Sequence, residues 1–150
     1  MKIIRFEEKY RDDLIFMILE AKNALGRVPG LNEDLLNIRA NYFDRGDSFW
    51  LAVDENDRVI GSVGFHFDSK CKTAVLHRLF VKCNRKRQGI GTALINTAET
   101  DLRSRGAKTV YVHLGSGEEW FESRYFYRKH GYTEYAPDRM KKEIVNAEES

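Results

Sequence analysis

Hydrophobic residues follow a strand period and then a helical period along the first third of the chain. Residues 2–6 predict a short strand, and the apolar positions within residues 10–25 recur at the spacing of one helix face. Gly26 then provides a helix stop. Asn32 can cap a second helix, which we expect to run to Gly46 with acidic residues in its first turn, where the helix dipole favours them.

The rest of the chain predicts short strands interrupted by two helices. Residues 49–53 and 59–67 are β-rich and are joined by a polar tight turn, so they predict a hairpin. The order of strand, two helices, three strands, helix, strand, helix and two strands indicates a mixed α/β (α+β) domain. The remaining elements are expected as strand 74–81, helix 90–106, strand 109–114, helix 118–130 and strands 132–135 and 142–145, followed by a frayed tail at 146–150.

Length and composition limit the class of protein. At 150 residues, with 42% hydrophobic and 32% charged residues, the chain predicts a single domain over residues 1–150. Its longest apolar run, residues 14–19, is far shorter than a membrane span, and its acidic start offers no secretory signal, so we expect a cytoplasmic protein without a membrane partner. Cys71 and Cys83 are too few for a disulfide framework and lack zinc-binding spacing, so no metal site is expected.

The nearly balanced charge, 25 basic against 23 acidic residues, hides an uneven distribution. Residues 69–98 hold seven basic residues and no acidic one, which leaves 18 basic residues (25 minus 7) against 23 acidic ones elsewhere. This pattern predicts a local site for an anion. The seven basic residues are Lys70, Lys72, Arg78, Lys82, Arg85, Lys86 and Arg87.

A Gly-Ile-Gly sequence opens the helix that follows this basic stretch. The first amides of a helix lack intrahelical partners and carry partial positive charge, so they bind phosphate where glycines allow close approach. Gly89 and Gly91 allow that approach, and Thr92 adds a hydroxyl. The segment matches neither the P-loop pattern nor the dinucleotide GxGxxG pattern, because Leu94 occupies the last glycine position. A glycine-containing turn with solvated charges is the alternative reading of this segment alone.

Three segments taken together resemble a known family. They are Leu79-Phe80-Val81, then Lys86-Arg87-Gln88-Gly89-Ile90-Gly91, then Phe126-Tyr127 ahead of Gly131-Tyr132. In this order and on these elements they resemble the GNAT superfamily of CoA-dependent N-acetyltransferases. The family's loop usually begins with Gln or Arg where this chain has Lys86. The resemblance implies the GNAT fold over nearly the whole chain: a central mixed, mostly antiparallel, twisted sheet of about six to seven strands with about four helices.

The resemblance also implies a cofactor, acetyl-CoA, and residues that bind it. The loop and helix start would hold the pyrophosphate, and the Leu79 N–H would polarise the acetyl carbonyl. Val81 would pair with the pantetheine arm like an added strand, and Tyr127 would protonate the leaving thiolate. A phenol with a pKa of about 10 can donate to a thiolate whose conjugate acid has a pKa of about 8.5. The implied cofactor-binding residues are Leu79, Phe80, Val81, Lys86, Arg87, Gln88, Gly89, Ile90, Gly91, Thr92 and Tyr127.

A general base is harder to assign. Strand alternation predicts that Val75, His77, Leu79 and Val81 share one face. Some family members carry a Glu base at the position of Val75, which cannot act as one. His77 is therefore the expected replacement, directly or through a water, and a structural role for this histidine is the alternative.

The main hypothesis is an N-acetyltransferase in which an amine attacks acetyl-CoA directly in a ternary complex. The expected partner is a small-molecule or peptide amine, for which residues 25–36 and 135–140 would shape the groove, in a monomer or homodimer. A catalytically inactive CoA-binding regulatory domain is one alternative. A nucleic-acid-binding module that uses residues 82–87 is a weaker one, because no recognised nucleic-acid motif surrounds the basic residues, and no nucleic acid is expected as partner.

Overall fold

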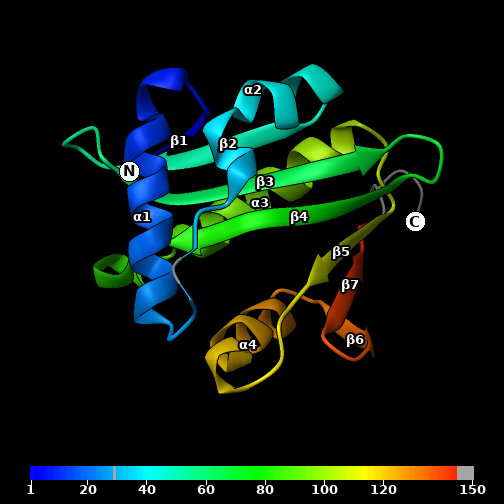
Figure 1. Cartoon of the computed structure of the whole chain (residues 1–150). Helices are drawn as coiled ribbons and strands as arrows, with labels where there is room; N and C mark the ends of the chain where they lie inside the picture. The colour runs from blue at the N-terminus through cyan, green and yellow to red at the C-terminus, as the bar shows by residue number, and fades with distance from the viewer. Residues whose placement is uncertain (29, 145–150) are drawn as a thin grey trace.

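A seven-stranded mixed sheet forms the centre of the protein in the computed structural model, which describes residues 1–28 and 30–144 (Figure 1). The strand order is β1-β2-β3-β4-β5-β7-β6. Only the central β4–β5 pair is parallel, and every other pair is antiparallel. The strands are β1 (Lys2–Arg5), β2 (Ser48–Val53), β3 (Val59–Asp68), β4 (Thr73–Val81), β5 (Thr109–His113), β6 (Thr133–Ala136) and β7 (Arg139–Glu143).

Helices cover both faces of the sheet. In the view of Figure 1, α1 and α2 lie in front of strands β2–β4, and α3 lies behind them. α4 lies beside β5 and β7, on the far side of the strands from α2, and its Phe126 packs against the start of α3. The fold class predicted from the sequence is confirmed. The α-helices are α1 (Arg11–Ala24), α2 (Ile38–Asn41), α3 (Ile90–Ser104) and α4 (Phe121–Lys129), and short 3₁₀ turns are η1 (Glu8–Tyr10), η2 (Glu33–Leu36), η3 (Phe43–Arg45), η4 (Cys83–Arg85) and η5 (Glu118–Trp120).

Each face of the sheet has its own apolar core. Leu14, Met17 and Ile18 of α1 are buried against β2 and β3 on one face, and Leu94 and Ala98 of α3 are buried on the other. Fully burying such a side chain stabilises the fold by about 1.5–3 kcal/mol. The helical spacing of these residues in the sequence therefore reflects two separate helix–sheet contacts.

A glycine sets how closely α3 approaches the sheet. A Cβ atom placed on Gly61 of β3 would lie 2.7 Å from Leu94 Cδ1 and 2.9 Å from Ile90 Cγ2. Because a real Cβ atom does not come so close, only glycine allows α3 to pack at this distance. The contact anchors the first turn of α3, which carries the Gly-Ile-Gly segment.

The prediction of one second helix is wrong. The segment consists instead of η2, α2 and η3, ending at Gly46 in the left-handed conformation. Asn37 interrupts it with a non-helical backbone, and its side chain accepts a hydrogen bond from Ala40 N, at 3.0 Å, as the cap of α2. Asn32 makes no such capping bond. A polar side chain that satisfies nearby amides competes with helix continuation, which explains the break.

The last strand is also displaced from its prediction. β7 covers Arg139–Glu143, whereas residues 142–145 were expected, because β7 pairs with β6 through a tight turn at Asp138, whose φ is +59°. Residues 145–150, including the predicted frayed tail, lie outside the described residues. The other predicted strands agree with the structure to within about one residue at each end.

Strand β4 does not keep its two-residue alternation. Its partners on β3 change from His77↔Gly64 to Phe80↔Ser62, so two β4 residues lie opposite Val63 alone. This is a β-bulge, and its first residue, Arg78, has φ +56°. The prediction that His77 shares a face with Leu79 and Val81 is therefore wrong: His77 points to the α1 side, while Leu79 and Val81 pack in the α3-side core.

Candidate functional site

The central parallel pair of strands separates soon after it begins. β4 pairs with β5 only from Thr73 to Val75, whereas β4 continues to Val81. Beyond Val75, no strand among residues 1–28 and 30–144 pairs with the edge of β4 that faces β5, so the main-chain groups of that edge lack strand partners. Such an edge can pair with an extended ligand.

The start of α3 lies next to this open edge. Gly89 is its N-cap in the left-handed conformation, with φ +78°, and a Cβ atom there would meet nothing within 4 Å. The first intrahelical donor is Ala93 N, which bonds Gly89 O at 3.0 Å. The amides of residues 90–92 therefore precede the helical hydrogen-bond ladder and form the partly positive end of a helix of 15 residues.

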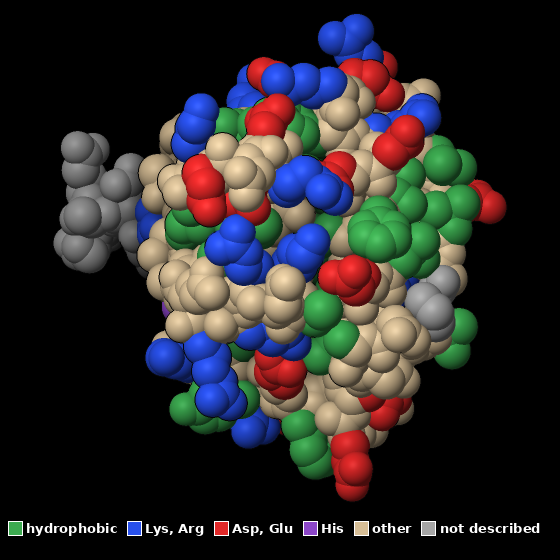
Figure 2. Space-filling view, turned by 90° about the vertical axis from the view of Figure 1, so that its left-hand side faces the viewer, with side chains coloured by type: hydrophobic (Ala, Val, Ile, Leu, Met, Phe, Trp, Pro, Cys, Tyr) green, Lys and Arg blue, Asp and Glu red, His purple; other side chains and the backbone are tan. Residues whose placement is uncertain are grey.

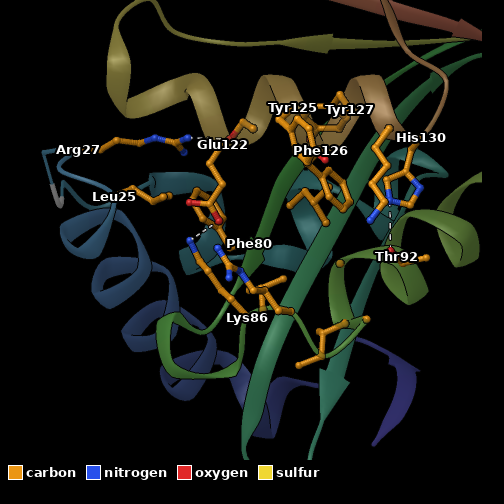
Figure 3. Close-up of a pocket in the computed structure, with 18 residues that line it drawn as sticks. Leu25, Arg27, Phe80, Lys86, Thr92, Glu122, Tyr125, Phe126, Tyr127 and His130 are labelled. Carbon is orange, nitrogen blue, oxygen red and sulfur yellow. Dashed lines mark hydrogen bonds and ion pairs between the residues drawn. The ribbon is translucent and has the colours of Figure 1, made fainter.

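Helix α4 forms the opposite wall of a cleft of about 720 Å³ (Figure 3). A Cβ atom on Gly91 would lie 3.1 Å from Phe126 Cε2, so this glycine allows α4 to pack against α3. Most of the cofactor-binding residues predicted from the sequence line this cleft, whereas Gln88 is exposed and does not. The lining residues are Leu25, Arg27, Leu79, Phe80, Val81, Lys86, Arg87, Gly89, Ile90, Gly91, Thr92, Glu122, Ser123, Tyr125, Phe126, Tyr127, Lys129 and His130.

Tyr127 is the buried phenol of this cleft. Its ring packs edge-on against Phe126, at 5.4 Å between centroids, and against Tyr132, at 5.3 Å. Burial raises the pKa of Tyr127 above that of a free phenol, and the Arg27 guanidinium opposes part of that rise. The hydroxyl is therefore protonated at neutral pH and can serve as an acid.

Two polar contacts cross the cleft from α4 to the loop and helix opposite. Lys86 Nζ lies 2.8 Å from Glu122 Oε1, and Thr92 Oγ1 lies 3.2 Å from His130 Nε2. Figure 3 shows both contacts as dashed lines between α4 and the residues 86–92. Both pairs therefore involve residues that the sequence assigns to anion binding.

Arg27, which was expected only in the segment that shapes the acceptor groove, lies in the cleft with Tyr127 and connects the end of α1 to α4. Its guanidinium lies 3.5 Å from the centre of the Trp120 ring, and its Nη2 donates to Ser123 Oγ at 2.9 Å and to Glu119 O at 3.3 Å. Burial lowers the pKa of Arg27, but the group stays charged at neutral pH. No local pattern in the sequence points to Arg27, because its partners are more than ninety positions away.

Helical spacing could have identified two other missed residues. Ser123 precedes Tyr127 by four positions and His130 follows it by three, so all three lie on one side of α4. Both line the cleft with Tyr127. A prediction based on the residues three and four positions from Tyr127 along the helix would have included Ser123 and His130.

The basic stretch contributes less free charge than its composition suggests. Arg78 pairs with Asp34 and Arg85 with Asp54, each at 2.8 Å, and Lys86 pairs with Glu122. Acidic and basic side chains are interspersed on the face of the molecule shown in Figure 2. Of the two cleft residues Lys86 and Arg87, Arg87 is the one with no ion pair among residues 1–28 and 30–144.

His77 lies outside the cleft that holds Tyr127. On the α1 side of β4, its ring makes an edge contact with His66, at 4.7 Å between centroids. Burial, together with the neighbouring His66 and Arg78, lowers the pKa of His77 to about 4. The imidazole is therefore neutral at pH 7. His113, at the end of β5, is near enough to contribute to this shift.

Within the described part of the chain, no helix has the length and apolar character needed to cross a membrane. The same residues contain no cluster of three or more His, Cys, Asp or Glu side chains suited to a metal ion.

Comparisons with known proteins agree with this geometry. Human N-acetyltransferase 8 is 34% identical over 88 residues, a match that covers 55% of this chain and 38% of the human protein. A GNAT-family acetyltransferase from Staphylococcus aureus Mu50 superposes with a TM-score of 0.83 at 21% identity, covering 95% of this chain and 98% of the other. An aminoglycoside 6'-N-acetyltransferase complexed with coenzyme A superposes with a TM-score of 0.74 at 22% identity, covering 97% and 98%.

The family assignment follows from the sequence match. Residues 15–132, which include the open strand, the start of α3 and Tyr127, match the model of the acetyltransferase (GNAT) family. The chain belongs to the GNAT acetyltransferase family.

Proposed function

We propose that this protein is an N-acetyltransferase that transfers the acetyl group of acetyl-CoA to an amine by direct attack in a ternary complex. The observation that carries the proposal is the juxtaposition of a free helix N-terminus, an unpaired strand edge and a buried tyrosine around one cleft. Each of these features suits a different part of the cofactor.

The residues of the cleft fit CoA. The amides of residues 90–92 and the Arg87 side chain suit a pyrophosphate, because oriented amides and a cation at a helix start both favour an anion. Gly89 leaves open space beside them. The free edge of β4 at residues 79–81 suits the amide groups of pantetheine, which would add to the sheet like a short strand.

Acetyl-CoA, when bound, supplies the acetyl group as a reactive thioester. We assign the Leu79 N–H to the thioester carbonyl oxygen, where a fixed donor stabilises the negative charge that develops. We assign Tyr127 to the sulfur, to which its hydroxyl gives a proton as the thiolate leaves. The burial that raises the pKa of Tyr127 keeps that proton in place until the thiolate forms.

The amine must lose a proton to become a nucleophile. At pH 7 only about one in 2,500 lysine-like amines is neutral, so such an acceptor needs a base. We assign His77 to this role, directly or through a water molecule, because it lies where β4 and β5 begin to separate. Its imidazole is neutral at pH 7 and can accept a proton, and the burial that lowers its pKa to about 4 also makes it a weaker base. The acceptor would approach from the α1 side of the sheet, across from the cofactor.

The acceptor class we propose is a small-molecule or peptide amine. A similar fold in an aminoglycoside acetyltransferase supports a small-molecule amine, and the exposed residues Leu31, Glu33 and Leu36 suit either kind. We place the reaction in the cytoplasm, where Cys71 and Cys83, both free, would stay reduced. We expect a monomer or homodimer and no nucleic-acid partner.

A thiol-release assay with acetyl-CoA and a panel of amines tests the function. Tyr127→Phe should lower kcat by about a hundredfold, the usual scale of lost acid catalysis, while calorimetry shows an unchanged Kd for CoA. Tyr111→Phe is the matched control, because Tyr111 of β5 carries the same phenol but does not line the cleft. Turnover that survives in Tyr127→Phe would remove the acid assignment. Binding of acetyl-CoA without transfer to any amine would indicate the regulatory domain instead.

A further inference from the structure

Arg78 occupies a position in β4 where a glycine would be expected. At the bulge, two β4 residues face one residue of β3, and the first of them adopts φ +56°. Bulges with a left-handed first residue normally have glycine there, because a Cβ atom crowds the backbone. The left-handed region disfavours other residues by a population ratio of roughly 5 to 30. Something else in the structure must therefore hold Arg78 in this conformation.

Two other elements hold Arg78 directly, η2 through Asp34 and β3 through Ser62. Asp34 of η2 accepts hydrogen bonds from Arg78 Nη2 at 2.8 Å and from Arg78 Nε at 3.1 Å, a bidentate ion pair. Tyr42 donates its hydroxyl hydrogen to Asp34 Oδ2 at 2.7 Å and orients that carboxylate. Ser62 of β3, which is fully buried, donates from Oγ to the Arg78 carbonyl at 2.7 Å.

These contacts are stronger than a surface ion pair. The side chains of Arg78 and Asp34 are 29% and 22% exposed, so water screens them only in part. A bidentate guanidinium–carboxylate pair also fixes the direction of both side chains. The Ser62 hydroxyl donates to the part-buried carbonyl of Arg78 at the bulge.

The bulge determines which way the next residues face. Because it inserts one residue, Leu79 and Val81 point to the α3 side and line the cleft together with Phe80. Without the bulge, the alternation would direct Leu79 and Val81 to the side on which His77 lies. The positions of the main-chain groups of residues 79–81 thus depend on the backbone conformation of Arg78.

We propose that Asp34, Arg78 and Ser62 form a clamp that holds the β4 bulge, and with it the main-chain donors and acceptors of residues 79–81, in the position that acetyl-CoA requires. The clamp rests on the proposed function and adds positioning residues to it. Since Asp34 belongs to η2, in the segment expected to border the acceptor, the clamp also connects the acceptor side of the sheet to the strand that holds the acetyl group.

Substitutions at position 78 separate the backbone role from a role of the side chain. Arg78→Ala removes the ion pair and keeps the steric strain, whereas Arg78→Gly removes the ion pair and the strain together. We expect Arg78→Ala to weaken acetyl-CoA binding, measured by calorimetry, by about tenfold, which lies within the cost of the left-handed conformation. We expect Arg78→Gly to stay within about threefold of the wild type. Equal effects of the two substitutions would overturn the proposal.

The contribution of Asp34 is tested in both backgrounds. Asp34→Asn should weaken acetyl-CoA binding in the wild-type protein but have no further effect together with Arg78→Gly, because no strain then remains to be held. An equal loss in both backgrounds would show that Asp34 acts independently of the bulge and would overturn the clamp. The comparison of Asp34→Asn alone with Asp34→Asn plus Arg78→Gly tests the clamp even if the Arg78→Ala protein does not fold.

A ligand-free measurement keeps the clamp distinct from the function. Hydrogen–deuterium exchange of residues 76–81 without ligand should become faster in Asp34→Asn and Arg78→Ala but not in Arg78→Gly. Unchanged exchange in all three variants would refute the clamp whatever the activity. Conversely, wild-type protein that neither binds CoA nor transfers acetyl groups would refute the proposed function. The exchange data would still show whether the clamp holds the β4 bulge. Lys72→Ala and Lys72→Gly are matched controls, because Lys72 is an exposed residue with φ +58° in the β3–β4 turn.

Discussion

The ion pair between Lys86 and Glu122 crosses the cleft that we assign to CoA. Its atoms Nζ and Oε1 lie 2.8 Å apart, and the two side chains are 30% and 60% exposed. A pair so open to solvent contributes about 0–1 kcal/mol. An incoming pyrophosphate must compete with Glu122 for Lys86 and also meets the negative charge of Glu122. Replacing Glu122 with glutamine should therefore strengthen CoA binding.

The expected increase in CoA affinity follows from the strength of the Lys86–Glu122 ion pair. Releasing an interaction of up to about 1 kcal/mol lowers the Kd for CoA by up to about fivefold, so we expect a two- to fivefold decrease for Glu122→Gln. The gain should shrink at high salt, because the Debye length falls from about 10 Å at 0.1 M to about 3 Å at 1 M. Titration calorimetry with CoA at both salt concentrations measures both effects.

Two further variants test whether the release of Lys86 causes the stronger CoA binding. Glu118→Gln removes one negative charge from the start of η5, where residues 1–28 and 30–144 provide no ion-pair partner for it, and should leave the Kd nearly unchanged. Lys86→Met combined with Glu122→Gln should lose most of the gain. A Kd that rises or stays constant in Glu122→Gln alone would refute the reasoning and indicate that the ion pair mainly holds α4 in place.

Three other perturbations test the site and the core. Gly91→Ala should weaken CoA binding by about tenfold in calorimetry, because the new Cβ atom lies 3.1 Å from Phe126 Cε2 and must displace α4. Lys142→Met should lower the free energy of unfolding in urea by about 2 kcal/mol, because it removes the cation 2.8 Å from Glu99, which is 2% exposed, and leaves that carboxylate with Arg103 at 3.5 Å and the Tyr132 hydroxyl at 2.9 Å. The added change Glu99→Gln should restore part of the loss. His77 has a pKa of about 4 when folded and about 6.5 when unfolded, so the unfolded state binds more protons between these values, and stability falls as the pH drops from 6.5 to 4. His77→Gln should remove roughly 2 kcal/mol of this acid sensitivity, and a curve of stability against pH identical to that of the wild type would contradict the assigned pKa.

Local patterns in the sequence predicted the parts of the site that depend on consecutive residues. Gly89 and Gly91 marked the start of α3, because a left-handed N-cap and a close helix contact both favour glycine. The position of Tyr127 ahead of Gly131 placed a phenol in the last turns of α4. Helical periodicity also identified the residues buried on each side of the sheet. These features are determined within a few turns of chain, so a single sequence contains them.

Other features depended on contacts between distant segments. Arg27 meets its partners on α4 only after α1 and α4 have docked, and Arg78 and Asp34 are 44 positions apart, so neither pairing leaves a local pattern. The basic residues of the stretch 69–98 therefore suggest more positive charge for anion binding than the structure provides, because several of them form ion pairs with distant acidic residues. Likewise, the break of the second helix at Asn37 depends on a side-chain cap that competes with the helix.

The sequence by itself determined the order of elements, the glycine-opened helix and the tyrosine on α4, because short-range periodicity and backbone preference specify each of them. The tertiary structure decided which face of β4 carries which residues. Strand alternation predicted that His77 shares a face with Leu79 and Val81. In the structure, the pairing with β3 contains an extra residue at Arg78, and Leu79 and Val81 therefore lie on the opposite face from His77. A bulge is a property of two paired strands, so it arises only when β3 and β4 come together.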